Sequence, residues 1–329
     1  MPRLTSADVA RESGVSRTTV SYVLNGKEGV AIPEATRQRV RDAAARLGYT
    51  PSAAARTLRS GRSDLVLCVL PDWTIGPVID TLLDHLTTEL ADRGLSVLVH
   101  HDRGPRPLAE LWRAVTPRAV LGLAPFAPDD ERAMRQAGIQ VVGSTLDEDP
   151  EHPGAFSVPQ TRIGRLQVEH LTGRGHRVLA YAAPSDDRLA AFADRRLDGV
   201  RLECERLGLP APQVQAVALD VASAAAAVQD WRAGAEPVTA VAAYNDEVAL
   251  AVLAGLRAEG LRTPQDVAVI GVDDIPAARL AAPALTTVWQ AIDAQATYLA
   301  AAVLAALDET VAPPAQPSDV VHVVARDST

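Results

Sequence analysis

Hydrophobic residues recur at helical spacing in three short stretches within residues 1–49. Thr5 can cap the first stretch, and Gly14 supplies the turn that follows it. The third stretch begins after Pro33 and ends at Gly48. Three short helices with a glycine turn between the first two are typical of a helix-turn-helix domain, whose second helix enters the major groove of DNA.

The second stretch has an apolar face and a polar face. Ser16 can cap it, and Val20, Val23 and Leu24 form the apolar face. The polar face carries side chains that can reach base edges and phosphates, namely Arg17, Thr18, Ser21, Tyr22 and Asn25. We expect these residues to bind DNA, together with Thr5 and Ser16 at the two helix starts. A merely solvated face is the alternative.

The alanine-rich residues 51–59 are too few for a stable helix, because isolated helices shorter than about 12 residues are marginal in water. We expect them to fold only when contacts with a partner helix and a DNA groove offset the conformational entropy that is lost on folding. A plain linker is the alternative, although linkers more often carry Gly, Ser or repeated Pro than three consecutive Ala.

From residue 64 onward, apolar runs alternate with amphipathic stretches. The runs lie at residues 65–70, 95–99, 119–124 and 139–143, and then at 177–183, 214–219, 239–244 and 267–272. This alternation predicts an α/β fold of parallel sheets flanked by helices on both faces. Two sets of about four strands predict two similar subdomains.

The two parts of the chain differ in the sign of their net charge. The whole chain is acidic, with 32 Lys and Arg against 41 Asp and Glu, but residues 1–62 hold 11 basic residues against 5 acidic ones. All but one of those basic residues are Arg, which suits bidentate contacts to phosphate and guanine. The asymmetry predicts one nucleic-acid-binding end on a body that does not bind nucleic acid. A solvated basic helix pair is the alternative.

The two cysteines, Cys68 and Cys204, lie singly in apolar or helical patterns, which predicts buried thiols in a reducing compartment. The first residues contain no long apolar run that could be a signal peptide, and no stretch of about 18 apolar residues follows. We therefore expect a cytoplasmic location and no membrane partner.

Six motifs occur in an order that resembles the LacI-type (lactose-repressor-like) bacterial regulators. They lie at residues 5–25 followed by 49–58, at 168–177, at 196–199, at 245–246, at 271–274 and at 285–290. The resemblance covers essentially the whole chain and implies a periplasmic-binding-protein-like core of two subdomains. The implied divisions are a helix-turn-helix domain (1–49), a hinge helix and linker (50–62) and a core (63–329), whose first subdomain spans about 63–158 and 291–316 and whose second spans about 159–290 and 318–326.

The resemblance also implies roles for residues in the DNA-binding end. Two hinge helices would pair in the minor groove at the centre of a palindrome, with Leu58 wedged between base steps and Arg56 or Arg59, beside Ala55, at the backbone or groove floor. Positions 17, 18 and 22 would be the main base readers. Family members often carry Arg where this chain has Tyr22, so the base preference there stays open.

Polar residues at strand ends predict an effector cleft between the subdomains. Asn245 and Asp273 each end a strand, and Arg196 lies on a helix; together these side chains suit hydroxyl groups. In the family these positions bind the effector, often a sugar. Trp73 is expected either to stack on the ligand or to pack in the core, and Trp289 to supply an aromatic wall.

Two departures leave the sugar class open. Residues 158–162 lack the acidic residue that many sugar-binding members carry, and residues 220–221 have no aromatic neighbour.

These patterns predict a transcriptional regulator, in the family's usual mode a repressor, that binds double-stranded DNA at a palindromic operator as a homodimer under the control of a small-molecule effector. The alternative is a cytoplasmic solute-binding protein or sugar-metabolising enzyme with an incidental helical domain. The chain carries no dinucleotide, phosphate-loop or nucleophile-elbow motif, and its histidines show no metal spacing. We therefore expect no enzyme activity, no cofactor and no metal.

Overall fold

The computed structural model describes residues 4–24, 30–49, 63–104, 107–147, 156–308, 310–317 and 320–329. The chain divides into a small unit, residues 1–64, and a large unit, residues 65–329. Among the described residues, no helix has the length and apolar character that crossing a membrane requires.

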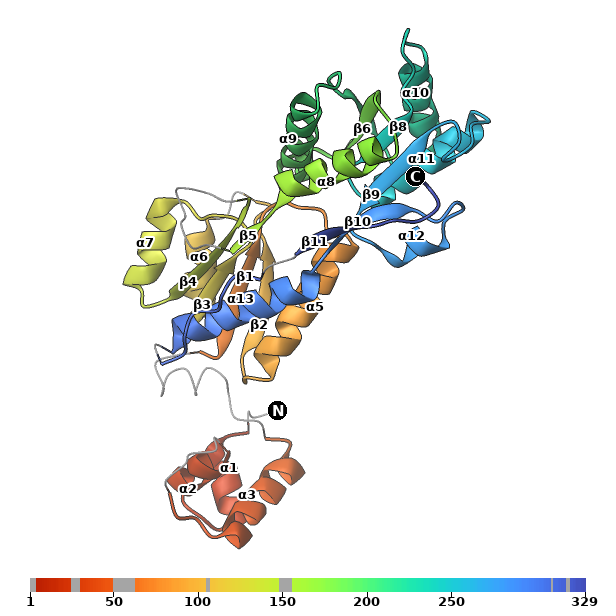
Figure 1. Cartoon of the computed structure of the whole chain (residues 1–329). Helices are drawn as coiled ribbons and strands as arrows, with labels where there is room; N and C mark the ends of the chain where they lie inside the picture. The colour runs from red at the N-terminus through yellow and green to blue at the C-terminus, as the bar shows by residue number, and fades with distance from the viewer. Residues whose placement is uncertain are drawn as a thin grey trace. The chain divides into compact units, whose positions relative to one another are not determined.

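The described part of the small unit forms the three helices that the sequence predicts (Figure 1). They are α1 (Ser6–Ser13), α2 (Arg17–Leu24) and α3 (Glu34–Leu47). Gly14 and Gly48 end α1 and α3 at φ 68° and 65°, in the left-handed region that glycine adopts without strain. Val9, Val20 and Val40, one from each helix, are fully buried in the common core. The predicted helix-turn-helix arrangement is thus confirmed.

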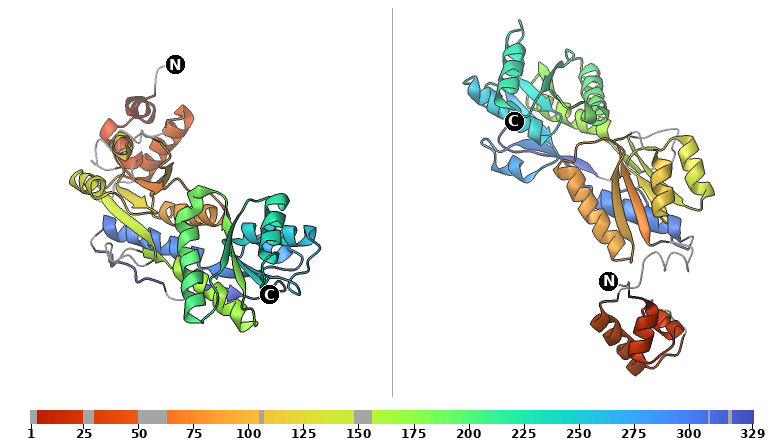
Figure 2. Two further views of the ribbon diagram at one scale, coloured as in Figure 1. Left: turned by 90° about the horizontal axis from the view of Figure 1, so that it is seen from above. Right: turned by 180° about the vertical axis from the view of Figure 1, so that it is seen from behind.

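The first sheet of the large unit contains five parallel strands in the order β2-β1-β3-β4-β5. The strands are β1 (Leu65–Leu70), β2 (Ser96–His101), β3 (Ala119–Gly122), β4 (Gln140–Leu146) and β5 (Phe156–Val158). Helices α5 (Pro77–Ala91) and α13 (Ile292–Leu307) lie side by side on one face (Figures 1 and 2), while α6 (Leu108–Val115) and α7 (Pro128–Gln136) cover the other. Alternate residues of β1 face the two layers: Cys68 packs toward α5 and α13, and Leu67 toward α6 and α7.

The second sheet contains six strands in the order β11-β10-β9-β8-β6-β7, of which only the β10–β11 pair is antiparallel. The strands are β6 (Leu179–Pro184), β7 (Gln213–Val217), β8 (Ala240–Ala243), β9 (Ala268–Val272), β10 (Thr286–Gln290) and β11 (Val321–Val324). Helices α8 (Gln160–Gly173) and α9 (Ala190–Arg206) cover one face, and α10 (Val221–Arg232) and α11 (Asp246–Ala258) cover the other (Figure 1). The short helices η1 (Asp187–Leu189) and α12 (Pro276–Leu280) follow β6 and β9.

Each of the eight predicted apolar runs overlaps a strand, so the predicted α/β architecture is confirmed. The sheets are larger than the predicted four strands each because β5, β10 and β11 lie outside the eight apolar runs. In β10, Thr286 and Thr287 are fully buried. The Thr287 hydroxyl donates to Oδ1 of Asp246 at 2.6 Å, and the hydroxyls of Thr286 and Thr329 lie 2.9 Å apart. These hydrogen bonds allow polar side chains to occupy core positions.

Helices α8 and α9 cross at two glycines that permit close backbone contact. A Cβ atom at Gly199 would lie 2.0 Å from the carbonyl oxygen of Thr161, and one at Gly164 would lie 2.0 Å from that of Arg196. The approach is open only to residues without a Cβ. It brings Gln160, at the start of α8, next to Arg196 on α9.

The substitution Gly199→Ala should therefore lower the free energy of unfolding by about 1–3 kcal/mol, because over-packing would force the two helices apart. Gly173→Ala, at a position with open space around it, is the matched control and should change stability by less than about 1 kcal/mol. Urea denaturation of both variants measures the difference. Equal stabilities would contradict the close crossing.

Candidate functional site

The solvent-facing side of α2 carries the residues that the sequence predicts to contact DNA. Arg17 and Thr18 are exposed, and Ser21 and Tyr22 are half-buried beside them. Val20 and Val23 point into the core of the small unit. The helix thus has the orientation that a groove-reading helix needs. The predicted residues Asn25, Ala55, Arg56, Leu58 and Arg59 lie outside the described residues.

The two helix starts expected to touch DNA also have structural partners. Thr5 donates its hydroxyl (2.8 Å) and its backbone N–H (3.0 Å) to Oδ2 of Asp8, and these bonds lower the pKa of that carboxyl. Oγ of Ser16 accepts the backbone N–H of Thr19 at 3.0 Å. Because the Thr5 hydroxyl proton is directed at Asp8, it is not directed at a phosphate.

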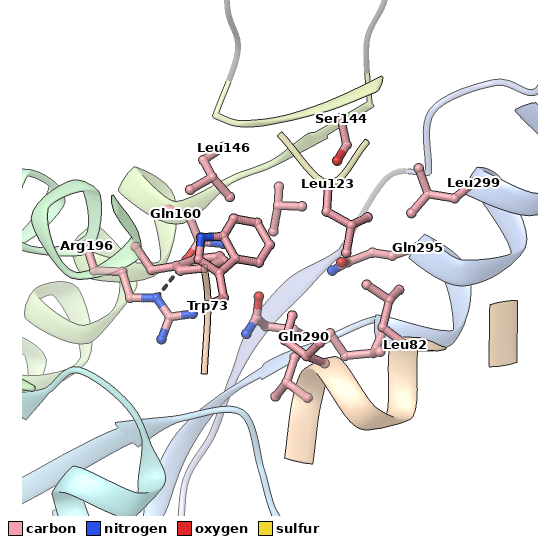
Figure 3. A pocket seen from close by; sticks show the side chains of 15 residues that line it. Trp73, Leu82, Leu123, Ser144, Leu146, Gln160, Arg196, Gln290, Gln295 and Leu299 are labelled. Atoms are coloured by element: carbon pink, nitrogen blue, oxygen red, sulfur yellow. Dashed lines mark hydrogen bonds between the residues drawn. The ribbon is translucent and has the colours of Figure 1, made fainter. Parts of the chain in front are cut away.

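A cleft in the large unit lies at the carboxyl ends of strands from both sheets, where ligands bind in open α/β folds. It contains two adjoining pockets that share Val78, Ile79, Phe192 and Arg196. The polar pocket is also lined by Thr74, Tyr244, Asn245, Glu247 and Asp273. The apolar pocket is lined by ten hydrophobic residues out of 15 (Figure 3).

Arg196 is the central cation of the cleft and is only 4% exposed. Its Nε donates to Oε1 of Gln160 at 2.7 Å, and its Nη1 donates to the carbonyl oxygen of Tyr244 at 2.6 Å. Its Nη2 lies 3.9 Å from Oδ1 of Asp273, and its guanidinium lies 4.8 Å from the centre of the Tyr244 ring. A buried guanidinium with so many partners is held in one orientation.

Asp273 stands opposite Arg196 in an unusual backbone conformation, with φ 111°. Its Oδ1 accepts a hydrogen bond from Nε2 of Gln290 at 2.7 Å. Burial raises its pKa to about 6, although the Arg196 charge and the Gln290 hydrogen bond act in the opposite direction. A strained backbone and a raised pKa of this kind are typical of functional sites.

Two neighbouring carboxylates, Asp246 and Asp274, tie loops together. Asp246 is fully buried and accepts the backbone N–H of Ile275 at 2.9 Å, in addition to the Thr287 hydroxyl. Asp274 forms ion pairs with Arg279 and Arg326. These contacts fix the β9–α12 loop, which includes Asp273.

Two contacts beside the cleft join segments that follow strands of the two sheets. The Trp73 ring, which follows β1, lies 4.5 Å from the Phe192 ring on α9. The Thr74 hydroxyl donates to Oδ2 of Asp186, beyond β6, at 2.8 Å. Trp73 is 6% exposed and lines the apolar pocket, so it both packs and faces the cleft.

The structure brings Trp73, Arg196, Asn245 and Asp273 together around the cleft but not Trp289. The Trp289 ring packs on His322 of β11, 4.7 Å away, and lines neither pocket. The expectation of an aromatic wall at this position is therefore wrong. Side chains alternate along a strand, so Gln290, the next residue, faces the cleft instead.

Sequence reasoning missed the glutamines of the cleft and the second aromatic residue. Phe192 was detectable, because it precedes Arg196 by four positions and so shares its helix face. Gln160, Gln290 and Gln295 carry no motif, and only the fold places them in the cleft.

Two family models match this chain. Residues 5–52 match "Bacterial regulatory proteins, lacI family", and residues 168–329 match "Periplasmic binding protein-like domain". The HTH-type transcriptional regulator CelR of Thermobifida fusca is 32% identical over 294 residues, which cover 86% of this chain and 85% of CelR. The chain belongs to the lacI family of bacterial regulatory proteins. It is a DNA-binding transcriptional regulator, as the sequence predicts.

Solved structures resemble the regulator over nearly its full length. A CelR–cellobiose complex matches with a TM-score of 0.67 and 27% identity, covering 99% of this chain and 100% of that chain. A lac repressor dimer bound to operator and the anti-inducer ONPF has the same fold, with a TM-score of 0.81 and 24% identity, covering 99% of this chain and 98% of that chain.

The raised pKa of Asp273 makes stability depend on pH. Because the folded pKa, about 6, exceeds the ordinary value of 3.8, the contribution of this group is fully present below about pH 4 and is lost as the pH rises through about 6. Each unit of difference between the folded and the unfolded pKa changes the free energy of unfolding by about 1.4 kcal/mol. Asp273→Asn keeps an acceptor for Gln290 but does not titrate, so its free energy of unfolding should fall less over this range.

Urea denaturation of the wild type and of Asp273→Asn at several pH values between about 4 and 7 checks this expectation. Asp84→Asn, at an exposed position on α5, is the matched control and should follow the wild-type curve. Parallel curves for the wild type and Asp273→Asn would rule out the assigned titration.

Proposed function

We propose that this regulator binds a palindromic operator as a homodimer and that a small effector in the cleft changes its operator affinity. The proposal is carried by one observation: a basic small unit with an exposed α2 is joined to a large unit whose cleft is lined by charged residues. The first part suits DNA, and the second suits a small molecule. In the family's usual mode the regulator represses transcription.

The α2 surface supports reading of the major groove. Arg17 can donate a bidentate pair to guanine, and the Thr18 hydroxyl can meet a base edge or a phosphate. Tyr22 offers one hydroxyl and a flat ring, so it reads a base in another way than Arg would. The residues proposed for the minor groove, including Leu58, belong to residues 50–62, which lie outside the described part of the chain.

One recognition helix has limited affinity for DNA, and a second copy of the chain would add a second recognition helix. Two half-sites joined in one dimer multiply affinity through effective concentration. The large unit has uncovered apolar side chains that a second copy could bury: Leu280 is 85% exposed and Leu219 is 64% exposed. Both features favour a dimer formed by the large unit.

A hydroxylated effector, such as a sugar, suits the polar pocket. The Asp273 carboxylate accepts hydrogen bonds from hydroxyls, and the Arg196 fork and the Asn245 amide donate them. The CelR relative holds cellobiose in its solved complex. Effector binding would alter the approach of the two sheets and, through residues 50–62, the operator affinity. A coupling of ~1–3 kcal/mol would change that affinity about 5- to 150-fold.

Arg17→Ala should weaken binding to a duplex selected by this protein from random sequences by about 5- to 150-fold, because one good arginine–base contact is worth ~1–3 kcal/mol. Fluorescence anisotropy at fixed salt measures the loss. Arg132→Ala, at an exposed position on α7 of the large unit, is the control and should bind as the wild type does. An equal loss in both variants would mean that α2 does not read the duplex.

Asp273→Ala should abolish the effector response while leaving operator affinity without effector unchanged. The effector is first found by thermal shift against sugars that include cellobiose, since a ligand at 100 times its dissociation constant adds ~2.7 kcal/mol of stability. The operator affinity of wild type and variant is then measured with and without that sugar. A normal response in the variant would show that the effector does not bind at Asp273.

A further inference from the structure

The chain crosses between the two sheets of the large unit beside a few neighbouring strands. The crossings follow β5 and β10 and precede β11. These strands lie at or next to one end of their sheets, whereas β1 and β6 lie toward the other end. A rotation of one sheet against the other about the crossings would therefore separate the ends of β1 and β6 more than the strand ends beside the crossings. We call the residues that follow β1 and β6, 71–74 and 185–188, the mouth segments.

One hydrogen bond joins the two mouth segments directly. The Thr74 hydroxyl donates to Oδ2 of Asp186 at 2.8 Å. Arg188 holds the same carboxylate, with its Nε 2.9 Å from Oδ1 and its Nη2 2.6 Å from Oδ2. The hydrogen bonds from Arg188 and Thr74 lower the pKa of Asp186, so the acceptor is charged at neutral pH. A hydrogen bond to a charged acceptor is stronger than one between neutral groups.

Charged groups on both sides of the mouth add to this contact. Arg103 fixes the first mouth segment, because its Nε lies 2.8 Å from Oδ1 of Asp72 and its Nη2 donates to the carbonyl oxygen of Trp73 at 2.5 Å. The pKa of Arg188 is raised mainly by Asp186 and further by the negative charge of Asp72. Asp72 and Arg188 belong to different mouth segments, so their attraction also favours the approach of the two sheets.

A contact beside the crossings behaves differently. Asp147, directly after β4, accepts the backbone N–H of Thr161 at 2.9 Å and the Thr161 hydroxyl at 2.7 Å. Thr161 lies only three residues beyond β5, so a rotation about the crossings would move these groups little. The same rotation would break the hydrogen bond at the mouth. Asp186 and Arg188 line neither pocket, so they can affect the cleft without touching a ligand.

We propose that the hydrogen bond from Thr74 to Asp186 is a latch that holds the two sheets together at the mouth and sets the fraction of time in which the cleft is open. Opening exposes the pockets to solvent, so the latch also controls how fast a small molecule enters and leaves them. The latch acts without a ligand. It therefore goes beyond the proposed effector control and does not rest on it.

The test measures opening with a thiol placed in the apolar pocket of the full chain. Ser144 lines this pocket and is 5% exposed, so the thiol of Ser144→Cys should react with the disulfide reagent DTNB when the cleft opens. The native thiols are buried, and burial raises the pKa of Cys68 to about 12 and that of Cys204 to about 11, so both react slowly. Adding Thr74→Val or Asp186→Ala should speed the reaction of the new thiol by about 2- to 10-fold, the effect of losing one hydrogen bond.

Asp187→Ala is the matched control. It removes the same charge from the next, exposed position and should leave the reaction rate unchanged. Thr74→Val and Asp186→Ala together should act no more strongly than either alone, because each removes the same hydrogen bond. Unchanged rates in both single variants, the same acceleration in Asp187→Ala, or a combined effect equal to the product of the two would overturn the latch.

The native thiols separate opening of the cleft from unfolding of the large unit. In a chain without Ser144→Cys, both latch variants should leave the slow reaction of Cys68 and Cys204 unchanged, because these thiols lie in the cores of the two sheets. An equal acceleration of the native thiols would show unfolding instead and would overturn the inference. The measurement uses no effector, so its outcome is independent of whether a cleft ligand changes operator affinity.

Discussion

The cleft depends on the burial of one guanidinium. Arg196 has almost no access to water, so its charge must be balanced by the groups around it. Those groups come from the start of α8 (Gln160) and from the ends of β8 (Tyr244) and β9 (Asp273). Gln160 lies within reach because α8 and α9 cross closely at two glycines. The helix crossing and the two strand ends together set the position of the charge that a ligand would meet.

Buried polar contacts in the large unit also fix the loops of the cleft. Asp246 reaches the Thr287 hydroxyl and the Ile275 N–H past Gly271, where a Cβ atom would lie 2.1 Å from the Asp246 carboxylate. Burial raises the pKa of Asp246 to about 7. Such a network is costly unless every member is bonded, and it holds the strand ends in one arrangement. A rigid polar pocket beside an apolar one is the result.

Most of the fold was predictable because its signals are local. Helical spacing and caps at Thr5, Ser16 and Gly14 define the small unit, and apolar runs define eight strands. The cleft was only partly predictable. Asn245 and Asp273 follow apolar strands and could be placed by the rule for strand ends, whereas Gln290 and Gln295 acquire meaning only from tertiary packing. Trp289 was misplaced because adjacent residues of a strand face opposite sides, and the pattern did not establish which side faces the cleft.

The regulator can act at one operator only if its small unit reads a DNA sequence. The most direct measurement is the affinity of the full chain for its selected duplex and for a shuffled duplex, by fluorescence anisotropy over a series of salt concentrations. The selected duplex should bind about 10³-fold or more tightly than the shuffled one, and both affinities should fall steeply with salt as phosphate contacts are screened. Equal affinity for the two duplexes would contradict the account.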